Sequence, residues 1–196
     1  MYRRKRNAVF WRCAVRARTN KTMKTKTITL YEYAELSPQA KEKALNKWRE
    51  TEDDPFMQSH MINLLKEELD ERGIKYDAES VDVRYSLSSC QGDGFMFEGE
   101  LVWGKYTIYI KHDGNSHYYH SNTANIEMQE TDNLGFHMDD EHADVKAFDA
   151  LYHEICKKME RVGYEHIEYV TSEESFEQAC EANEWTFRED GTREDT

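Results

Sequence analysis

Three residue types that organise many small proteins are scarce in this sequence. Its 196 residues include 4 cysteines, 2 prolines and 9 glycines. The cysteines, at positions 13, 90, 156 and 180, form no Cys-x-x-Cys pair, which excludes a disulfide framework and the usual structural zinc spacing. This usage is typical of reduced thiols in a cytosol. No apolar run approaches the roughly 20 residues of a membrane-spanning helix, so we expect no membrane partner.

Basic residues are scarce beyond position 26. Residues 1–26 hold ten Lys or Arg and no acid, whereas the rest of the chain holds 39 Asp or Glu against 16 Lys or Arg. We expect residues 1–26 to be a basic N-terminal extension, either disordered or, over residues 1–22, upstream of a natural start at Met23. Arg12 and Arg16 interrupt the only apolar run that a secretory signal would use there.

The net charge of −23 over residues 27–196 restricts the partners of this part of the chain. So acidic a body repels phosphate backbones, which excludes direct nucleic-acid binding by the acidic domain. It suits a partner protein with a basic surface instead. The plainer alternative is that the surplus acids only keep the protein soluble, and the composition leaves both open.

Two helix starts and a long apolar stripe predict the helical part of the fold. Ser37-Pro38 and Asp54-Pro55 are typical start signals, and Gly73 is a typical left-handed end of the second helix. A longer helix is predicted from about Glu141 to Val162, with Gly163 just past its end. A shorter helix should follow Thr171, which has capping-box spacing to Glu174.

Apolar residues alternate with polar ones in the segments between these helices, which predicts strands. The expected strands are Thr27–Tyr31, 81–88, Phe95–Trp103, Tyr106–Lys111, part of Ser116–Met128, and a short one at Trp185–Phe187. The predicted fold class is therefore α+β, with an antiparallel sheet of about four to six strands and helices packed on one face. We expect a single domain over residues 27–191 and a tail over residues 192–196.

The sharpest local motif is Gln91-Gly92-Asp93-Gly94, between two predicted strands. If the motif is purely structural, Asp93-Gly94 would supply the positive φ angles that a tight hairpin turn requires, and Gly92 would relax the bulge before that turn. As a site, the two glycines would let a partner or ligand approach the backbone, with Gln91 and Asp93 as polar contacts. We take these four residues as the candidate binding site.

The sequence contains no recognised catalytic or metal-binding pattern. His117 and His120 would point to opposite faces of a strand, and the acidic loop with His137 and His142 lacks a known ligand spacing. Phosphate-loop, dinucleotide and nucleophile-elbow motifs are absent. We therefore expect a non-enzymatic protein with no metal and no cofactor.

Three stretches resemble a family of small uncharacterised tailed-phage proteins, some of them labelled antitoxins of toxin–antitoxin stability systems. The stretches are Tyr33-Ala-Glu-Leu-Ser-Pro-Gln-Ala-Lys-Glu-Lys-Ala-Leu-Asn-Lys-Trp48, Tyr85-Ser-Leu-Ser-Ser-Cys-Gln-Gly-Asp-Gly-Phe-Met-Phe-Glu-Gly99 and Ala182-Asn-Glu-Trp-Thr-Phe-Arg-Glu-Asp-Gly191. The resemblance spans most of residues 27–191 and implies a phage or prophage origin and a bacterial host cytoplasm. It implies no catalytic residue, and Phe95-Met96 stands where the family has small residues.

Two functions follow as expectations. The first is a phage accessory protein that binds and inhibits a host protein with a basic surface, as an antitoxin-like or counter-defence inhibitor. The alternative is a module that binds or sequesters a small molecule or nucleotide beside the Gly92-Asp93-Gly94 turn, with aromatic strands as a platform.

Overall fold

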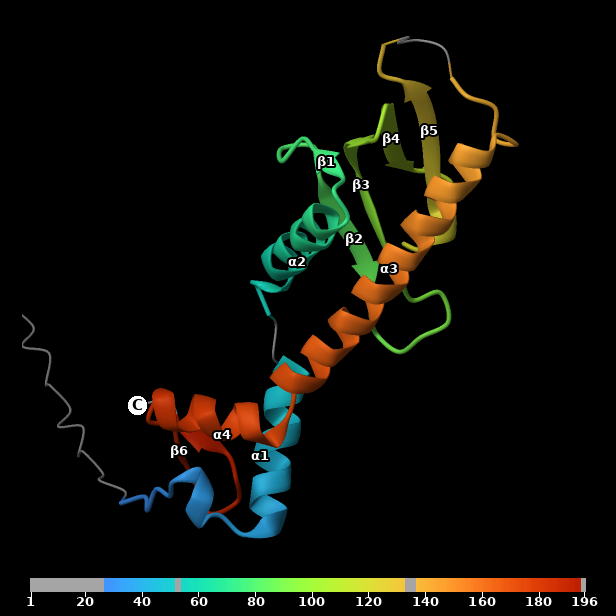
Figure 1. The fold of residues 1–196 in the computed structure, drawn as a ribbon. Coiled ribbons are helices and arrows are strands. Elements are labelled where there is room, and N and C mark those ends of the chain that lie inside the picture. The colour runs from blue at the N-terminus through green and yellow to red at the C-terminus, as the bar shows by residue number, and fades with distance from the viewer. Residues whose placement is uncertain (1–26, 52–53, 133–136, 195–196) are drawn as a thin grey trace, which may run out of the picture.

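The computed structural model describes residues 27–51, 54–132 and 137–194. The described chain forms two lobes joined by one long helix (Figure 1). We call residues 54–132 and 137–170 the large lobe, and residues 27–51 and 171–194 the small lobe. The predicted basic extension over residues 1–26 lies outside the described residues.

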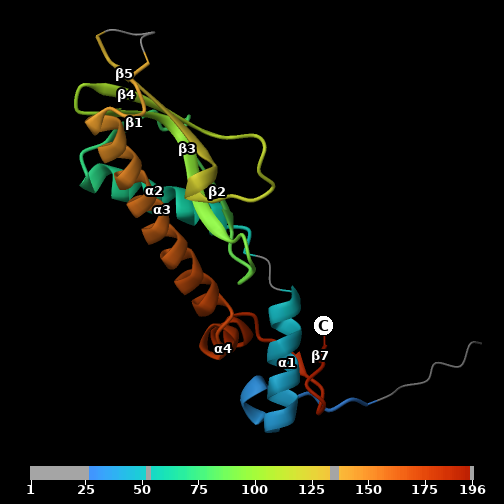
Figure 2. The same ribbon diagram turned by 90° about the vertical axis from the view of Figure 1, so that its right-hand side faces the viewer.

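The large lobe is an antiparallel sheet with two helices on one face (Figures 1 and 2). Its strands are β1 (Lys75–Tyr76), β2 (Asp82–Ser86), β3 (Gly94–Trp103), β4 (Tyr106–His112) and β5 (Ala124–Glu130). β1 and β2 pair with different parts of β3, and β4 and β5 follow in order. Helices α2 (Met57–Glu71) and α3 (Ala143–Val170) bury their apolar stripes against the sheet. The predicted α+β class, strand number and one-sided helix packing are confirmed.

The small lobe has its own buried cluster. It contains the 3-10 turn η1 (Tyr33–Glu35), helices α1 (Pro38–Thr51) and α4 (Glu173–Ala182), and the two-stranded hairpin β6 (Thr186–Phe187) with β7 (Arg193–Glu194). Phe176 of α4 lies at the centre, because the rings of Tyr33, Trp48, Trp185 and Phe187 surround it at centroid distances of 4.9–6.3 Å. The chain thus brings residues near both ends into one core, separate from the core of the large lobe.

The boundaries of several predicted elements differ from the structure. Thr27–Tyr31 is no full strand, because only Tyr31 pairs, with Phe187, and Ile28 and Leu30 stay exposed without a neighbouring strand. Arg193–Glu194, placed in the predicted tail, pair with β6. Whether residues 27–191 behave as one domain stays a prediction.

Two segments of the large lobe also differ. The strand predicted within Ser116–Met128 begins only at Ala124, after the 3-10 turn η2 (Ser121–Thr123). This turn contacts both α3 and β3, and its Thr123 hydroxyl lies 3.5 Å from the Met96 sulfur.

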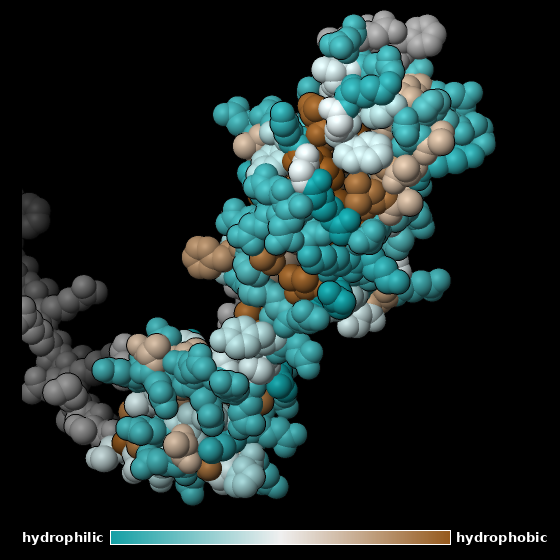
Figure 3. Space-filling view, in the orientation of Figure 1, coloured by the Kyte–Doolittle hydropathy of each residue, from teal (hydrophilic) through white to brown (hydrophobic). Residues whose placement is uncertain are grey.

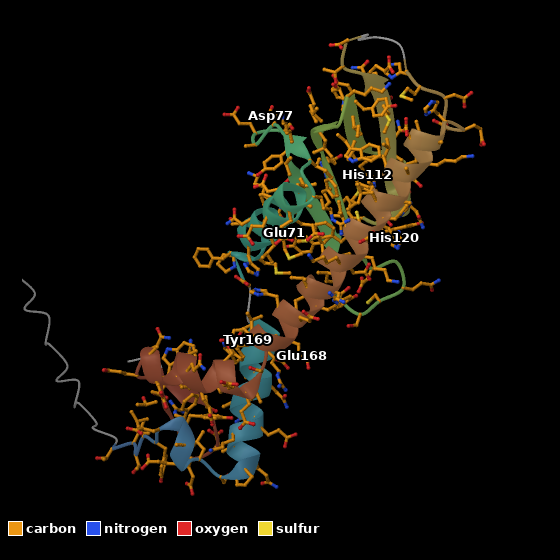
Figure 4. The ribbon with its side chains drawn as sticks, in the orientation of Figure 1. Glu71, Asp77, His112, His120, Glu168 and Tyr169 are labelled. Carbon is orange, nitrogen blue, oxygen red and sulfur yellow. The ribbon has the colours of Figure 1, made fainter. Side chains whose placement is uncertain are left out.

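Gly163 lies inside α3 rather than past its end. The helix continues to Val170, and Figure 4 shows Glu168 and Tyr169 where it reaches the small lobe. A Cβ at Gly163 would lie 2.5 Å from Cδ1 of Leu87. Gly163 therefore provides close packing against the β2–β3 loop and is no helix cap. The next helix is capped by Ser172, not by Thr171, whose hydroxyl donates to the Ile167 carbonyl of α3.

Candidate functional site

The candidate motif lies in a seven-residue loop between β2 and β3. Ser86 pairs with Gly94, so the loop comprises residues 87–93. The positive φ angles belong to Ser89 (60°) and Gly92 (97°), and Asp93 and Gly94 have none. The prediction that Asp93-Gly94 forms a tight positive-φ turn is therefore wrong, because the longer loop reverses the chain earlier and leaves Gly94 as the first residue of β3.

Glycine is required at position 94 because the backbone of residues 119 and 120 lies directly against it. A Cβ at this position would lie 2.7 Å from Cδ2 of His120 and 2.9 Å from the carbonyl oxygen of Tyr119. Figure 4 shows His120 beside the ribbon of α3. The Nδ1 atom of His120 accepts from the backbone N–H of Asn122 at 3.2 Å and so caps η2. The segment 118–120 thereby covers one side of the motif.

The Asp93 carboxylate holds the loop together. Oδ1 accepts from the hydroxyls of Ser86 and Ser88 at 3.0 and 3.2 Å. Oδ2 accepts from the Cys90 backbone N–H at 2.9 Å and from the Tyr164 hydroxyl of α3 at 2.8 Å. The Cys90 N–H, followed by the three hydroxyl donors, lowers the pKa of Asp93 to about 2. A carboxylate with four donors is an anchor and not an acid–base catalyst at neutral pH.

The other polar group of the motif points away from this network. Gln91 is exposed, and its side chain makes no hydrogen bond to a described residue. Tyr118, which is 49 % exposed, lies beside Gly92. The structure therefore separates the four predicted residues: Asp93 and Gly94 serve the fold, and Gln91 and Gly92 remain available to a ligand or partner.

Several described histidines serve as caps and packing groups, and His166 of α3 also bonds the distant Asp54 at 2.7 Å. Across the described ranges, no group of three or more His, Cys, Asp or Glu side chains is arranged to hold a metal ion. His142 instead caps α3, because its Nδ1 accepts from the Asp144 N–H at 3.2 Å. No helix in the described part of the chain is both long enough and apolar enough to cross a bilayer.

Two polar clusters around the buried residues Glu68 and Tyr152 were not predicted from the sequence. Glu68 on α2 accepts from Arg72 at 2.7 Å and from Lys158 on α3. Burial raises the pKa of Glu68, but the bonds from Lys158 and Arg72 outweigh burial and lower it overall. Tyr152 donates to the Phe97 carbonyl of β3 at 3.1 Å, and burial raises its pKa strongly. Both clusters join α3 to its neighbours. Tyr152 and Glu68 are themselves buried, whereas the Lys158 side chain is 42 % exposed.

The small lobe carries an acidic groove of about 610 Å³. We use this name for the hollow lined by Glu32, Glu177, Glu181, Glu184, Tyr33, Cys180 and Trp185, together with Ala34 and Thr186. Of the residues that the structure describes, no Lys or Arg lines it. Figure 3 shows that hydrophilic residues also dominate the visible face of both lobes.

Three carboxylates of this groove follow one another along the end of α4 and the residues after it. Glu177 and Glu181 lie four residues apart and share one side of the helix, and Glu184 lies two residues past its end with a φ of 52°. None of the three forms an ion pair with another described residue. Burial and then Glu177 raise the pKa of Cys180 to about 11, so the thiol in the floor is protonated and unreactive.

Comparison with known proteins identifies no relative. No family model, no curated protein and no solved structure matches the chain.

Proposed function

We propose that the protein is a non-catalytic binding protein that inhibits a partner by covering a basic surface on it. The observation that carries the proposal is the acidic groove, which is lined by four glutamates and, among the described residues, by no Lys or Arg. Glu177, Glu181 and Glu184, which form a row at the end of α4, are all exposed, so their carboxylates are accessible to another molecule. A row of unpaired carboxylates beside the aromatic ring of Trp185 suits Lys or Arg side chains from another protein.

The row of glutamates also lowers the stability of α4, which supports a role in binding and not in folding. Like charges three or four residues apart on a helix repel each other. Acids near a helix C-terminus also oppose the helix dipole, and α4 has no base in its last turn. A groove selected only for stability would place a Lys or Arg at one of these positions.

The biological setting of the proposal comes from the resemblance to tailed-phage proteins. It favours a phage accessory protein acting in a bacterial host cytoplasm, either antitoxin-like or as a counter-defence inhibitor. The partner is then a host protein whose basic surface contacts nucleic acid or another acidic ligand.

Capture from host lysate at low and high salt tests this function. The wild-type protein should recover one stoichiometric protein at low salt and lose it as salt rises, because exposed charges are screened. The matched comparison is Glu177→Gln/Glu181→Gln/Glu184→Gln against Glu67→Gln/Glu71→Gln/Glu79→Gln, which removes the same charge from exposed positions of the large lobe. Only the α4 variant should lose the partner. Equal capture by both variants would contradict the proposal.

A further inference from the structure

A second cavity, of about 670 Å³, lies on another side of the small lobe. It is formed between α1 and the β6–β7 hairpin and shares no lining residue with the acidic groove among the described residues. Its rim carries Lys43, Lys47 and Arg193, and Glu50 is the only described acid that lines it. Its charge is therefore opposite to that of the acidic groove.

The lining of this cavity is unusual for the lobe that contains it. Residues 27–51 and 171–194 hold 12 acids and six Lys or Arg. Three of the six bases line the one cavity, against one of the 12 acids. Such segregation of positive charge within an acidic lobe favours an anionic ligand.

The floor of the cavity is aromatic and firmly held. Trp48 stacks on Phe176 with ring centroids 5.0 Å apart, and Phe187 packs edge-on against Phe176. The hairpin wall is held close to α1, because a Cβ at Gly191 would collide with the Ala40 carbonyl oxygen. The cavity is therefore a preformed apolar hollow.

Two of the rim cations, Lys43 and Lys47, can leave their present partners for a ligand at low cost in stability. Lys43 bonds Asp190 at 2.7 Å and Thr192 at 3.2 Å, and Lys47 bonds Glu50 at 3.2 Å. All four charged side chains are 54–72 % exposed, and ion pairs this exposed contribute little to stability. Arg193 is positioned by the Trp185 ring, 4.5 Å from its guanidinium carbon.

We propose that this cavity binds a small organic anion with a planar apolar body and one phosphate, sulfonate or carboxylate group. The apolar body would lie over the aromatic floor, and the anionic group would meet Lys43, Lys47 and Arg193. The volume falls within the range of small-molecule sites and exceeds what an inorganic ion fills. The proposal is independent of the acidic groove and of the partner protein.

Fluorescence titration of the full chain with 1-anilinonaphthalene-8-sulfonate tests the proposal, with the uncharged N-phenyl-1-naphthylamine as the matched probe. The sulfonate should bind at a single site and more tightly than the uncharged probe. Lys47→Gln should weaken sulfonate binding about five-fold, the value of one charge contact in a high-dielectric setting, and Lys47→Glu should weaken it further. The control Lys111→Gln changes the same charge at an exposed position of β4, outside the cavity.

Two results would overturn the proposal. One is equal affinity for the charged and the uncharged probe, which would show that the rim cations do not contribute to binding. The other is equal affinity of Lys47→Gln and Lys111→Gln for the sulfonate, which would place the dye elsewhere. Because Lys47 is exposed on α1, both variants should keep the wild-type melting temperature, so loss of binding cannot be attributed to unfolding.

Discussion

The Tyr164 hydroxyl donates a 2.8 Å hydrogen bond to Oδ2 of Asp93. This bond joins the β2–β3 loop to α3 across 71 residues of sequence. Because the same carboxylate also accepts from Ser86, Ser88 and Cys90, one ionised side chain organises the loop and attaches it to the longest helix.

Asp93→Asn should therefore lower the melting temperature near neutral pH. The amide of the variant would have one acceptor oxygen where Asp93 has two. Its NH2 group would face hydroxyl or N–H donors, with which it cannot form the same hydrogen bonds. The pKa of Asp93 is about 2 in the folded protein, against about 3.9 in an unfolded chain. The carboxylate thus stabilises the fold fully above about pH 4, and this contribution is lost as pH falls towards 2. Melting temperatures of wild type and variant should converge over that interval. A constant difference down to pH 2 would contradict this role.

Gly94→Ala should destabilise the protein by about 1–3 kcal/mol, the usual cost of overpacking. The new methyl group would meet the backbone of Tyr119 and the ring of His120, and the backbone cannot move without disturbing η2. Gly114→Ala is the comparison, because no described atom lies within 4 Å of the place its methyl group would take, so it loses only the roughly 1 kcal/mol of backbone strain at its positive φ of 72°. Chemical denaturation should show the larger loss for Gly94→Ala with an unchanged m-value.

Glu68→Gln should lower the free energy of unfolding by about 1–3 kcal/mol, because it weakens charge-assisted bonds from Arg72 and Lys158. Glu67→Gln, one position away and exposed, should change stability by less than about 0.5 kcal/mol. The lowered pKa of Glu68 means that its contribution is present above the unfolded value and disappears as pH falls through the folded one. Urea denaturation at pH 7 and pH 3 measures both effects, and equal losses at the two pH values would contradict the account.

Gly163→Ala should show strong coupling to Leu87. Alanine favours a helix interior by about 1 kcal/mol over glycine, but its methyl group would collide with the Leu87 side chain. In a Leu87→Ala background the collision disappears, so the same substitution should stabilise the protein by about 1 kcal/mol. A double-mutant cycle by denaturation measures the coupling. Purely additive effects would show that Gly163 does not pack on Leu87.

The local elements of the fold were predictable, because they depend on patterns within a few residues. Ser37 accepts from the Ala40 N–H as a helix cap, and Gly73 has the expected positive φ of 68°. The stripe of α1 was also correct, but its partner is α4 and the hairpin rather than the sheet. No local pattern distinguishes these two partners, because either would bury the same face.

The candidate site was predictable only in part. The motif Gln91-Gly92-Asp93-Gly94 marks a chain reversal, as expected, but the donors to Asp93 include Tyr164, which no spacing rule connects to it. The acidic groove combines Glu32 with residues about 150 positions later. Its one sequence signal is the run from Glu173 to Glu184, which contains five acids and no base.

The affinity of the captured partner for the α4 charge variant tests the central claim most directly. Titration calorimetry at low salt should show that Glu177→Gln/Glu181→Gln/Glu184→Gln weakens binding at least ten-fold, while the variant itself becomes more stable by about 0.5 kcal/mol as like-charge repulsion is removed. The large-lobe control Glu67→Gln/Glu71→Gln/Glu79→Gln should bind as the wild type does. Equal affinity of the two variants, or binding that does not weaken with salt, would contradict the account.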